Sequence, residues 1–311
     1  MEGIHIEALY QLRLWERDVK FLKTATDRAK KIGGVKDLLH REVGGYEKAR
    51  SQREIHASAL TKEVEYCPRE VRLMELLEKK QKDQWIPMTL RLTFDEGRMK
   101  QHALNNLYLS KFMVGSWYCG RCRTTVAWSK GKPKSGGMLG DSICPGHEWE
   151  YREPFFIDPI SEAQGAVDSL IELPGHKKLR MCEVKIMATS MWPPVAPLAE
   201  HKLRTQFYLS LMARSEHKHK HEIDLHEASV LYWLRGHGKK DENGDISPFK
   251  EFVVKRDDDS VEYLFKKATE LTVARGSGVL PNPICPHQMC PRAEKCPVSK
   301  ECFSVGIIIP D

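Results

Sequence analysis

Apolar residues recur at helical spacing in several stretches of the chain. The pattern predicts an amphipathic helix over 58–80, with Ser58 as its capping residue, and a second helix that begins near Asp95. The stretch 197–214 also has clear helical spacing, and a last helix is predicted over about 260–274. The first 56 residues are predicted to be helical and basic, without recognisable chemistry.

Other stretches have the apolar runs and turn signals of short strands. The segment 165–186 reads as two strands around a Pro-Gly turn, and ASVLYWLRG and FKEFVVKR read as two more, joined by the turn-rich GKKDENGDISP. HKHKH, at 217–221, is predicted to be an exposed loop. The order of helices and strands predicts an α/β or α+β core with two cysteine-rich attachments.

Composition narrows the class of protein. The 311 residues have a net charge of +6, which favours a polyanionic partner. No apolar run approaches membrane-spanning length, and the first residues have no apolar signal core, so we expect a soluble protein of the cell interior with no membrane partner. The cysteine count, nine, is odd, which argues against a disulfide scaffold in such a protein.

Two short pairs of possible metal ligands, Cys119 with Cys122 and Cys144 with His147, bracket a segment rich in glycine, lysine and serine. Their spacing, C-x2-C, 21 residues, then C-x2-H, matches zinc modules in which two tight turns supply three thiolates and one imidazole. We therefore predict an insert over 115–150 that holds Zn²⁺ in a closed, structural site. Its basic residues suit phosphate contacts, and a solvated basic loop is the alternative.

A second cysteine group lies near the C-terminus, with gaps of four, five and five residues between Cys285, Cys290, Cys296 and Cys302. Such even spacing favours an iron–sulfur cluster, with zinc as the alternative. Cys67 is followed by proline, as are three of these four, and is a fifth candidate. Because a 4Fe–4S cluster takes four ligands, one of the five would be spare.

The segment 165–186 carries charges on strands that otherwise read as buried. Asp168 lies on the first strand, and Glu183 and Lys185 lie two residues apart on the second, so these two side chains share one face. Paired carboxylates suit Mg²⁺ or Mn²⁺, which can activate water for attack on a phosphodiester, and a nearby lysine can stabilise the charge that develops. The alternative is a surface hairpin with a cross-strand salt bridge. Cys182 is predicted to be a small buried hydrophobic residue.

In this order, the residues resemble the PD-(D/E)XK nuclease superfamily, in the RecB-like branch with an iron–sulfur cluster. That branch includes CRISPR-associated RecB-like nucleases and the nuclease domain of AddB. The likeness covers about residues 58–303. SALTKEVEYCPREVRLMEL resembles the helix with the lone cluster cysteine, EGRMKQH the helix whose histidine precedes the core, GAVD and EVK the catalytic strands, and TQFYLSLM the helix that follows.

The resemblance implies a restriction-endonuclease-like α/β core, with a central mixed sheet flanked by helices, an Fe–S-stapled helical part and a zinc-ribbon-like insert. The nuclease domain would span 58–311, preceded by a helical segment, 1–57, and interrupted by the insert, 115–150. The implied metal ligands for Mg²⁺ or Mn²⁺ are His102, Asp168, Glu183 and the backbone carbonyl of Val184. Lys185 would assist the attacking water, and Gln206 would contact the active site or DNA.

Two features depart from that family. Its usual tyrosine, four residues after the glutamine, is Ser210 here, and its C-terminal cysteines usually run C-x2-C-x5-C, whereas the gaps here are wider and a cysteine is added.

The implied activity is exonuclease action on single-stranded DNA or DNA ends, in recombination, repair or phage-type replication. The implied setting is the cytoplasm, that of a phage's host included, with recombination or replication proteins as further partners. Two other functions fit the same residues: a non-catalytic nucleic-acid-binding protein that uses its zinc and Fe–S modules, and a zinc-ribbon interaction protein with no nucleic-acid role.

Overall fold

The computed structural model describes residues 43, 45–47, 54–62, 65–79, 84–133, 148–188, 195–235, 239–240, 244 and 246–304. The chain divides into two units, one of Met1–Ala49 with Lys82–Asp95 and one of Arg50–Gln81 with Glu96–Asp311. In the first unit, β1 (Gly45–Glu47) pairs antiparallel with β3 (Gln84–Ile86). Both β1 and, in the second unit, β2 (Ile55–His56) lie within the segment 1–57 that was predicted to be helical, so that prediction is wrong at these residues. The rest of the segment lies largely outside the described residues.

The second unit is built on a four-stranded mixed sheet with the order β14-β11-β10-β9. Its strands are β9 (Ser169–Ile171), β10 (Arg180–Met187), β11 (Glu227–Leu234) and β14 (Phe249–Lys255). Strands β10 and β11 are parallel, and the two outer pairings are antiparallel. The predicted strands ASVLYWLRG and FKEFVVKR, and the second strand of 165–186, are thereby confirmed. The first strand of that segment is interrupted: β8 (Ala163–Ala166) ends before Asp168 and β9 begins at Ser169, so Asp168 lies between two strands and not on one.

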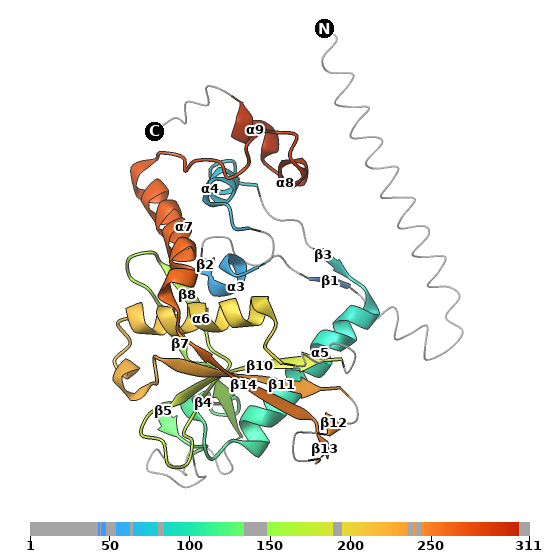
Figure 1. Cartoon of the computed structure of the whole chain (residues 1–311), viewed down its shortest axis with the longest axis vertical. Coiled ribbons are helices and arrows are strands. Elements are labelled where there is room, and N and C mark those ends of the chain that lie inside the picture. Colours follow the sequence, from blue (N-terminus) through green and yellow to red (C-terminus); the bar gives the residue numbers. More distant parts are fainter. Residues whose placement is uncertain are drawn as a thin grey trace, which may run out of the picture. The chain divides into compact units, whose positions relative to one another are not determined.

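Helix α6 (Ala199–Arg214) is the crossover between the parallel strands β10 and β11, and it lies beside α7 (Asp258–Ser277) (Figure 1). Eight consecutive residues of α6, 205–212, are buried, because the helix has packing partners on more than one side. The largest core cluster joins α6, α7 and the sheet; for example, Phe207 stacks on Phe265 with ring centroids 4.5 Å apart. Both helices were predicted from their apolar spacing.

Three smaller sheets complete the described strands. They are β2 (Ile55–His56) with β8 (Ala163–Ala166) and β7 (Phe155–Ile157); β5 (Thr125–Lys130) with β4 (Val114–Cys119) and β6 (Trp149–Arg152); and β12 (Lys239–Lys240) with β13 (Ile246–Ser247). The second of these contains the described part of the predicted insert. The result is a mixed α/β protein with several sheets flanked by helices, as predicted at that level.

The predicted single helix over 58–80 is wrong. Two helices, α3 (Ala57–Leu60) and α4 (Pro68–Leu76), replace it, with a break between them. The break has a local cause: a residue that precedes proline is disfavoured in the helical region, and Cys67 has an extended backbone at φ −114°, ψ 107°. Pro68 then takes the first helical position, where no N–H is needed.

Two other predicted elements differ in extent. The helix expected near Asp95 begins at Met88, as α5 (Met88–Ala103), and continues as the π-helix η1 (Leu104–Tyr108). The exposed loop expected at 217–221 is partly ordered: η3 (Lys220–Glu222) lies within it, and the half-buried His219 stacks on Trp128. The short helices α8 (Pro291–Glu294) and α9 (Ser299–Phe303) complete the described elements. None of the helices in the described ranges combines the length and apolar composition that a membrane crossing requires.

Candidate functional site

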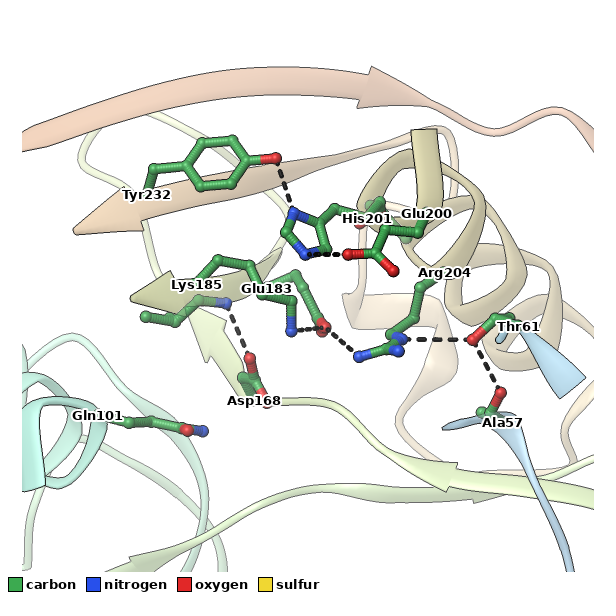
Figure 2. Close-up of polar contacts among 12 residues, drawn as sticks. Ala57, Thr61, Gln101, Asp168, Glu183, Lys185, Glu200, His201, Arg204 and Tyr232 are labelled. Atoms are coloured by element: carbon green, nitrogen blue, oxygen red, sulfur yellow. Dashed lines mark hydrogen bonds and ion pairs between the residues drawn. The ribbon is translucent and has the colours of Figure 1, made fainter. Parts of the chain in front are cut away.

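Asp168 lies in the short connection between β8 and β9, directly opposite the middle of β10. Its Oδ2 accepts a hydrogen bond of 2.8 Å from the Val184 backbone N–H. Its own carbonyl accepts one from the Asn105 side chain, which also accepts from Ser169. Side chain and backbone of Asp168 are therefore both fixed, so the carboxylate has a defined place beside Glu183 and Lys185 (Figure 2).

Glu183 is the most buried charged group of the site, with only 2% of the residue exposed. Its Oε1 accepts a hydrogen bond of 2.5 Å from Lys185 Nζ, whereas no described group donates to Oε2, which is also buried. Burial raises the pKa of this carboxyl, and the neighbouring Asp168 raises it further. A buried carboxylate oxygen without a hydrogen-bond partner is costly, so this atom is suited to a cation.

Two cations lie next to Glu183 Oε1, one from β10 and one from α6. Burial alone would lower the pKa of Lys185, but the carboxylates of Glu183 and Asp168 outweigh it, and the net effect is a raised pKa. Arg204, from α6, lies 4.0 Å from Glu183 Oε1 and donates to Thr61 (Figure 2). Lys185 and Arg204 thus place two positive charges next to Glu183.

The described residues contain no group of three or more His, Cys, Asp or Glu side chains placed to hold a metal ion. Two carboxylates are nevertheless sufficient for Mg²⁺, which usually keeps several waters and is bound through one or two carboxylates together with substrate phosphates. The unpartnered oxygen of Glu183 and the adjacent Asp168 therefore fit such an ion.

His102, the predicted third ligand, is exposed on α5. The side chain of the preceding residue, Gln101, extends towards the carboxylates (Figure 2). Gln101 donates a 2.9 Å hydrogen bond to Glu153, a residue that the sequence analysis did not identify. The ligand role of His102 stays a prediction, and the geometry favours Gln101 with Glu153 as the groups on this side.

Glu153 follows β6 and is exposed to solvent. The pKa of its carboxyl is nevertheless raised to about 7, by loss of hydration and by the negative charges of Asp168 and Glu183. A side chain can be open to water on one side and still have enough protein around its carboxyl to weaken hydration. No motif surrounds Glu153 in the sequence, so only its place in the fold relates it to the site.

His201, on the first turns of α6, was also missed. Its Nδ1 lies 2.9 Å from the Tyr232 hydroxyl and its Nε2 lies 3.2 Å from Glu200 (Figure 2). The Tyr232 hydroxyl accepts from the Leu198 N–H, so its own proton is available to His201 Nδ1, and Nε2–H then donates to Glu200. Burial and the charges of Lys185 and Arg204 lower the pKa of His201 to about 4, which keeps the ring neutral.

The remaining residues predicted from α6 point elsewhere. Gln206 is buried, and its amide donates to the Lys255 carbonyl at 3.4 Å. Ser210, at the position of the family's tyrosine, donates to Asp258 at 2.5 Å. Tyr208 is nearer to the site: burial raises the pKa of its hydroxyl, and the negative charges of Glu183 and Asp168 raise it further. The roles predicted for Gln206 and for the Val184 carbonyl stay predictions.

Gly165 leaves room for the side chains that pack against β8. A Cβ at this position would lie 2.8 Å from the Tyr208 ring and 3.0 Å from Ala57. The glycine therefore allows α6 to approach β8. Cys182 is buried, as predicted, and burial raises the pKa of its thiol.

Half of the predicted zinc site is described. Cys119 and Cys122 lie on the tight turn between β4 and β5, where the Arg123 N–H donates to the Cys119 carbonyl at 2.8 Å. Arg123 has a left-handed backbone, at φ 59°, which closes this turn. Cys144 and His147 lie outside the described residues.

The other cysteine group surrounds a pocket between α4 and the C-terminal segment. Four thiols line it, those of Cys67, Cys285, Cys296 and Cys302, together with Arg292. Cys290 is not among the lining residues; its Sγ accepts from the Ala293 N–H at 3.3 Å, and its thiol also interacts with that of Cys285. Arg69 holds the two segments together by donating to the carbonyls of Pro281 and Cys302, at 2.9 and 3.2 Å.

A scan of the chain against protein-family models finds no match, and a search of curated proteins finds none either.

Proposed function

We propose that the protein is a metal-dependent DNA nuclease of the PD-(D/E)XK type. The observation that carries this proposal is the buried, unpartnered Oε2 of Glu183, next to Asp168 and on the same strand as Lys185. A salt-bridged surface hairpin would expose these groups or pair every oxygen. A cation site would leave an oxygen of this kind for the ion.

Asp168 and Glu183 would hold Mg²⁺ or Mn²⁺, which supplies a Lewis acid and an activated water for phosphodiester hydrolysis. Lys185 is held in place by Glu183 Oε1, and its raised pKa keeps it protonated, so it is suited to stabilise the negative charge that develops on phosphate. Arg204 adds a second positive charge next to Glu183. Gln101 and Glu153 would border the water that enters the site.

The order of elements supports the same proposal. The antiparallel pair β9–β10, the crossover helix α6 and the parallel strand β11 are consistent with the restriction-endonuclease-like core that the resemblance implies. The proposed substrate is single-stranded DNA or a DNA end, in recombination, repair or replication within the cytoplasm, with proteins of those processes as further partners.

We place the proposed 4Fe–4S cluster at the cysteines that line the pocket between α4 and the C-terminal segment. Cys67, Cys285, Cys296 and Cys302 would be its ligands, and Cys290 would be the spare cysteine. The Arg292 guanidinium, 3.7 Å from Cys285 Sγ, would balance thiolate charge. For Zn²⁺, Cys119 and Cys122 on one tight turn supply half of the proposed structural site.

The test is cleavage of end-labelled single-stranded, duplex and circular DNA with Mg²⁺ or Mn²⁺. In Asp168→Asn, we expect the rate to fall at least about 100-fold, because metal assistance is worth several kcal/mol and each 1.36 kcal/mol is tenfold in rate. The exposed Asp259 provides a matched control, since Asp259→Asn makes the same chemical change away from the site.

Undiminished cleavage by purified Asp168→Asn would refute the assignment of this site. A wild-type protein that binds DNA but cleaves none of the substrates would instead be a non-catalytic nucleic-acid-binding protein, and one that does neither would fit the zinc-ribbon interaction protein.

A further inference from the structure

Three segments far apart in the sequence meet at the β9–β10 turn. They are the end of β5 at 130–132, the turn at 174–178, and the loop after α6 at 216–222. Leu179 joins the turn to the loop: its N–H donates to the Glu222 carbonyl at 2.8 Å, and its carbonyl accepts from Asp224 at 2.9 Å. Lys130 joins β5 to the end of β9 through an ion pair of 3.2 Å with Glu172.

Trp128 fixes the loop against β5. Its ring stacks on His219 with centroids 4.5 Å apart and an interplanar angle of 9°, and its Nε1 donates to Glu222 at 3.3 Å. His219 also contacts Glu222, at 2.7 Å. The loop is thus held by contacts with β5 and with the turn. The tertiary structure therefore places Lys218 near the lysines of the turn.

Positive charge predominates where the three segments meet. The three segments and Glu172 contain six lysines and three glutamates, and two of these glutamates are already engaged, with Lys130 and with His219. We call the exposed lysines the basic end surface; they are Lys130, Lys132, Lys177, Lys178 and Lys218. Among the described residues, four of them form no ion pair, and Lys130 pairs only with Glu172. Unpaired, exposed cations from several segments are the usual footprint of a phosphate-binding surface.

We propose that the basic end surface binds the phosphate backbone of DNA outside the catalytic site. This inference rests on the proposed nuclease function and adds a second contact region to it. Strand β10 runs from this surface to the carboxylates, so Leu179 and Val184 are roughly 16 Å apart at 3.3 Å per residue. At 3.4 Å per phosphate along one B-form strand, this corresponds to about five nucleotides. A substrate long enough to reach both regions would be bound more tightly than a shorter one.

The test compares DNA binding by two triple variants, both in the Asp168→Asn background and without added Mg²⁺. The first is Lys132→Gln/Lys177→Gln/Lys178→Gln. The control, Lys266→Gln/Lys295→Gln/Lys300→Gln, removes the same charge from exposed lysines on or next to α7, α8 and α9. Anisotropy of fluorescein-labelled DNA, single-stranded and duplex, 20 nucleotides long, is measured as a function of NaCl concentration.

We expect the slope of log K against log[NaCl], which is negative, to decrease in magnitude by about 2 to 3 in the first variant, because each phosphate contact contributes about 0.7 to 0.9 to it. The control variant should keep the parent slope. If the first variant melts at the same temperature as its parent, misfolding is excluded as the cause of the change in slope. The single variant Lys178→Gln provides a second measurement, in which the slope should change by a smaller amount.

Equal slopes for the first variant and its parent would overturn the proposal, as would a parent that binds no DNA. Unchanged DNA binding together with loss of binding to anionic phosphatidylserine vesicles would assign the surface to a membrane instead. Because binding is measured without cleavage, failure of the nuclease assignment and failure of this proposal are distinguishable.

Discussion

The charged residues of the site fix one another's positions and charge states. Asp168 is held by the Val184 N–H, Glu183 is held by Lys185, and the ammonium of Lys185 is kept charged by both carboxylates. Breaking a buried pair leaves an uncompensated charge, which is strongly destabilising. Glu183 and Lys185 therefore have to be present together, whichever reaction they serve.

His201 gives the protein a pH-dependent stability. Its pKa is lowered from 6.5 to about 4, so the unfolded chain takes up a proton in this window and the folded protein does not. His201 therefore contributes stability that is present above pH 6.5 and is lost as the pH falls towards 4, up to about 3 kcal/mol.

We expect His201→Gln to lose less free energy of unfolding than wild type between pH 6.5 and pH 4, measured by urea denaturation. His226→Gln, at an exposed histidine, serves as the control and should follow wild type. If His201→Gln and wild type lose the same amount, the ring is not held neutral by the fold.

At the scale of elements, the close approach of α6 to β8 depends on Gly165. The Cβ of an alanine would lie 2.8 Å from Tyr208 and 3.0 Å from Ala57, so Gly165→Ala should reduce the free energy of unfolding by about 1–3 kcal/mol, the usual range for overpacking. Chemical denaturation measures this change.

Gly276→Ala is the matched control for this prediction. Gly276 lies in α7, and a Cβ there would meet nothing within 4 Å, so alanine should stabilise the helix by about 0.5–1 kcal/mol. If Gly165→Ala were as stable as wild type, the Tyr208 ring would have room to move away from the new Cβ. The close approach between residue 165 and Tyr208 would then not position α6.

At the scale of the whole molecule, the cysteine pocket joins α4 to a segment more than 200 positions later in the chain. We expect anaerobically purified Cys290→Ser to keep the brown colour and iron content of wild type. Cys296→Ser, the matched change within the same segment, should lose both, because Cys296 lines the pocket and Cys290 does not.

Iron analysis and absorbance near about 400 nm, where Fe–S proteins absorb, provide the measurement. A colourless Cys290→Ser protein would make Cys290 a ligand, and a wild-type protein that contains only zinc would exclude the cluster.

Local patterns in the sequence were sufficient for much of the secondary structure. Apolar spacing located α6 and α7, and alternating or apolar runs located β10, β11 and β14, because these patterns reflect which face of an element is buried. The same reasoning placed Asp168, Glu183 and Lys185 on one hairpin. It failed at 58–80, where the apolar pattern continues across a proline that ends one helix and starts another.

The sequence by itself therefore determined the type and order of most elements, the hairpin with its three charges, and the two cysteine groups. Only the tertiary structure decided what faces those charges: Gln101, Glu153, His201 and Arg204 come from other elements and have no motif of their own. It also decided that four cysteines line one pocket and that the basic segments meet at the β9–β10 turn. The physical reason is that burial and charge proximity depend on contacts between distant segments, whereas spacing along the chain records only local periodicity.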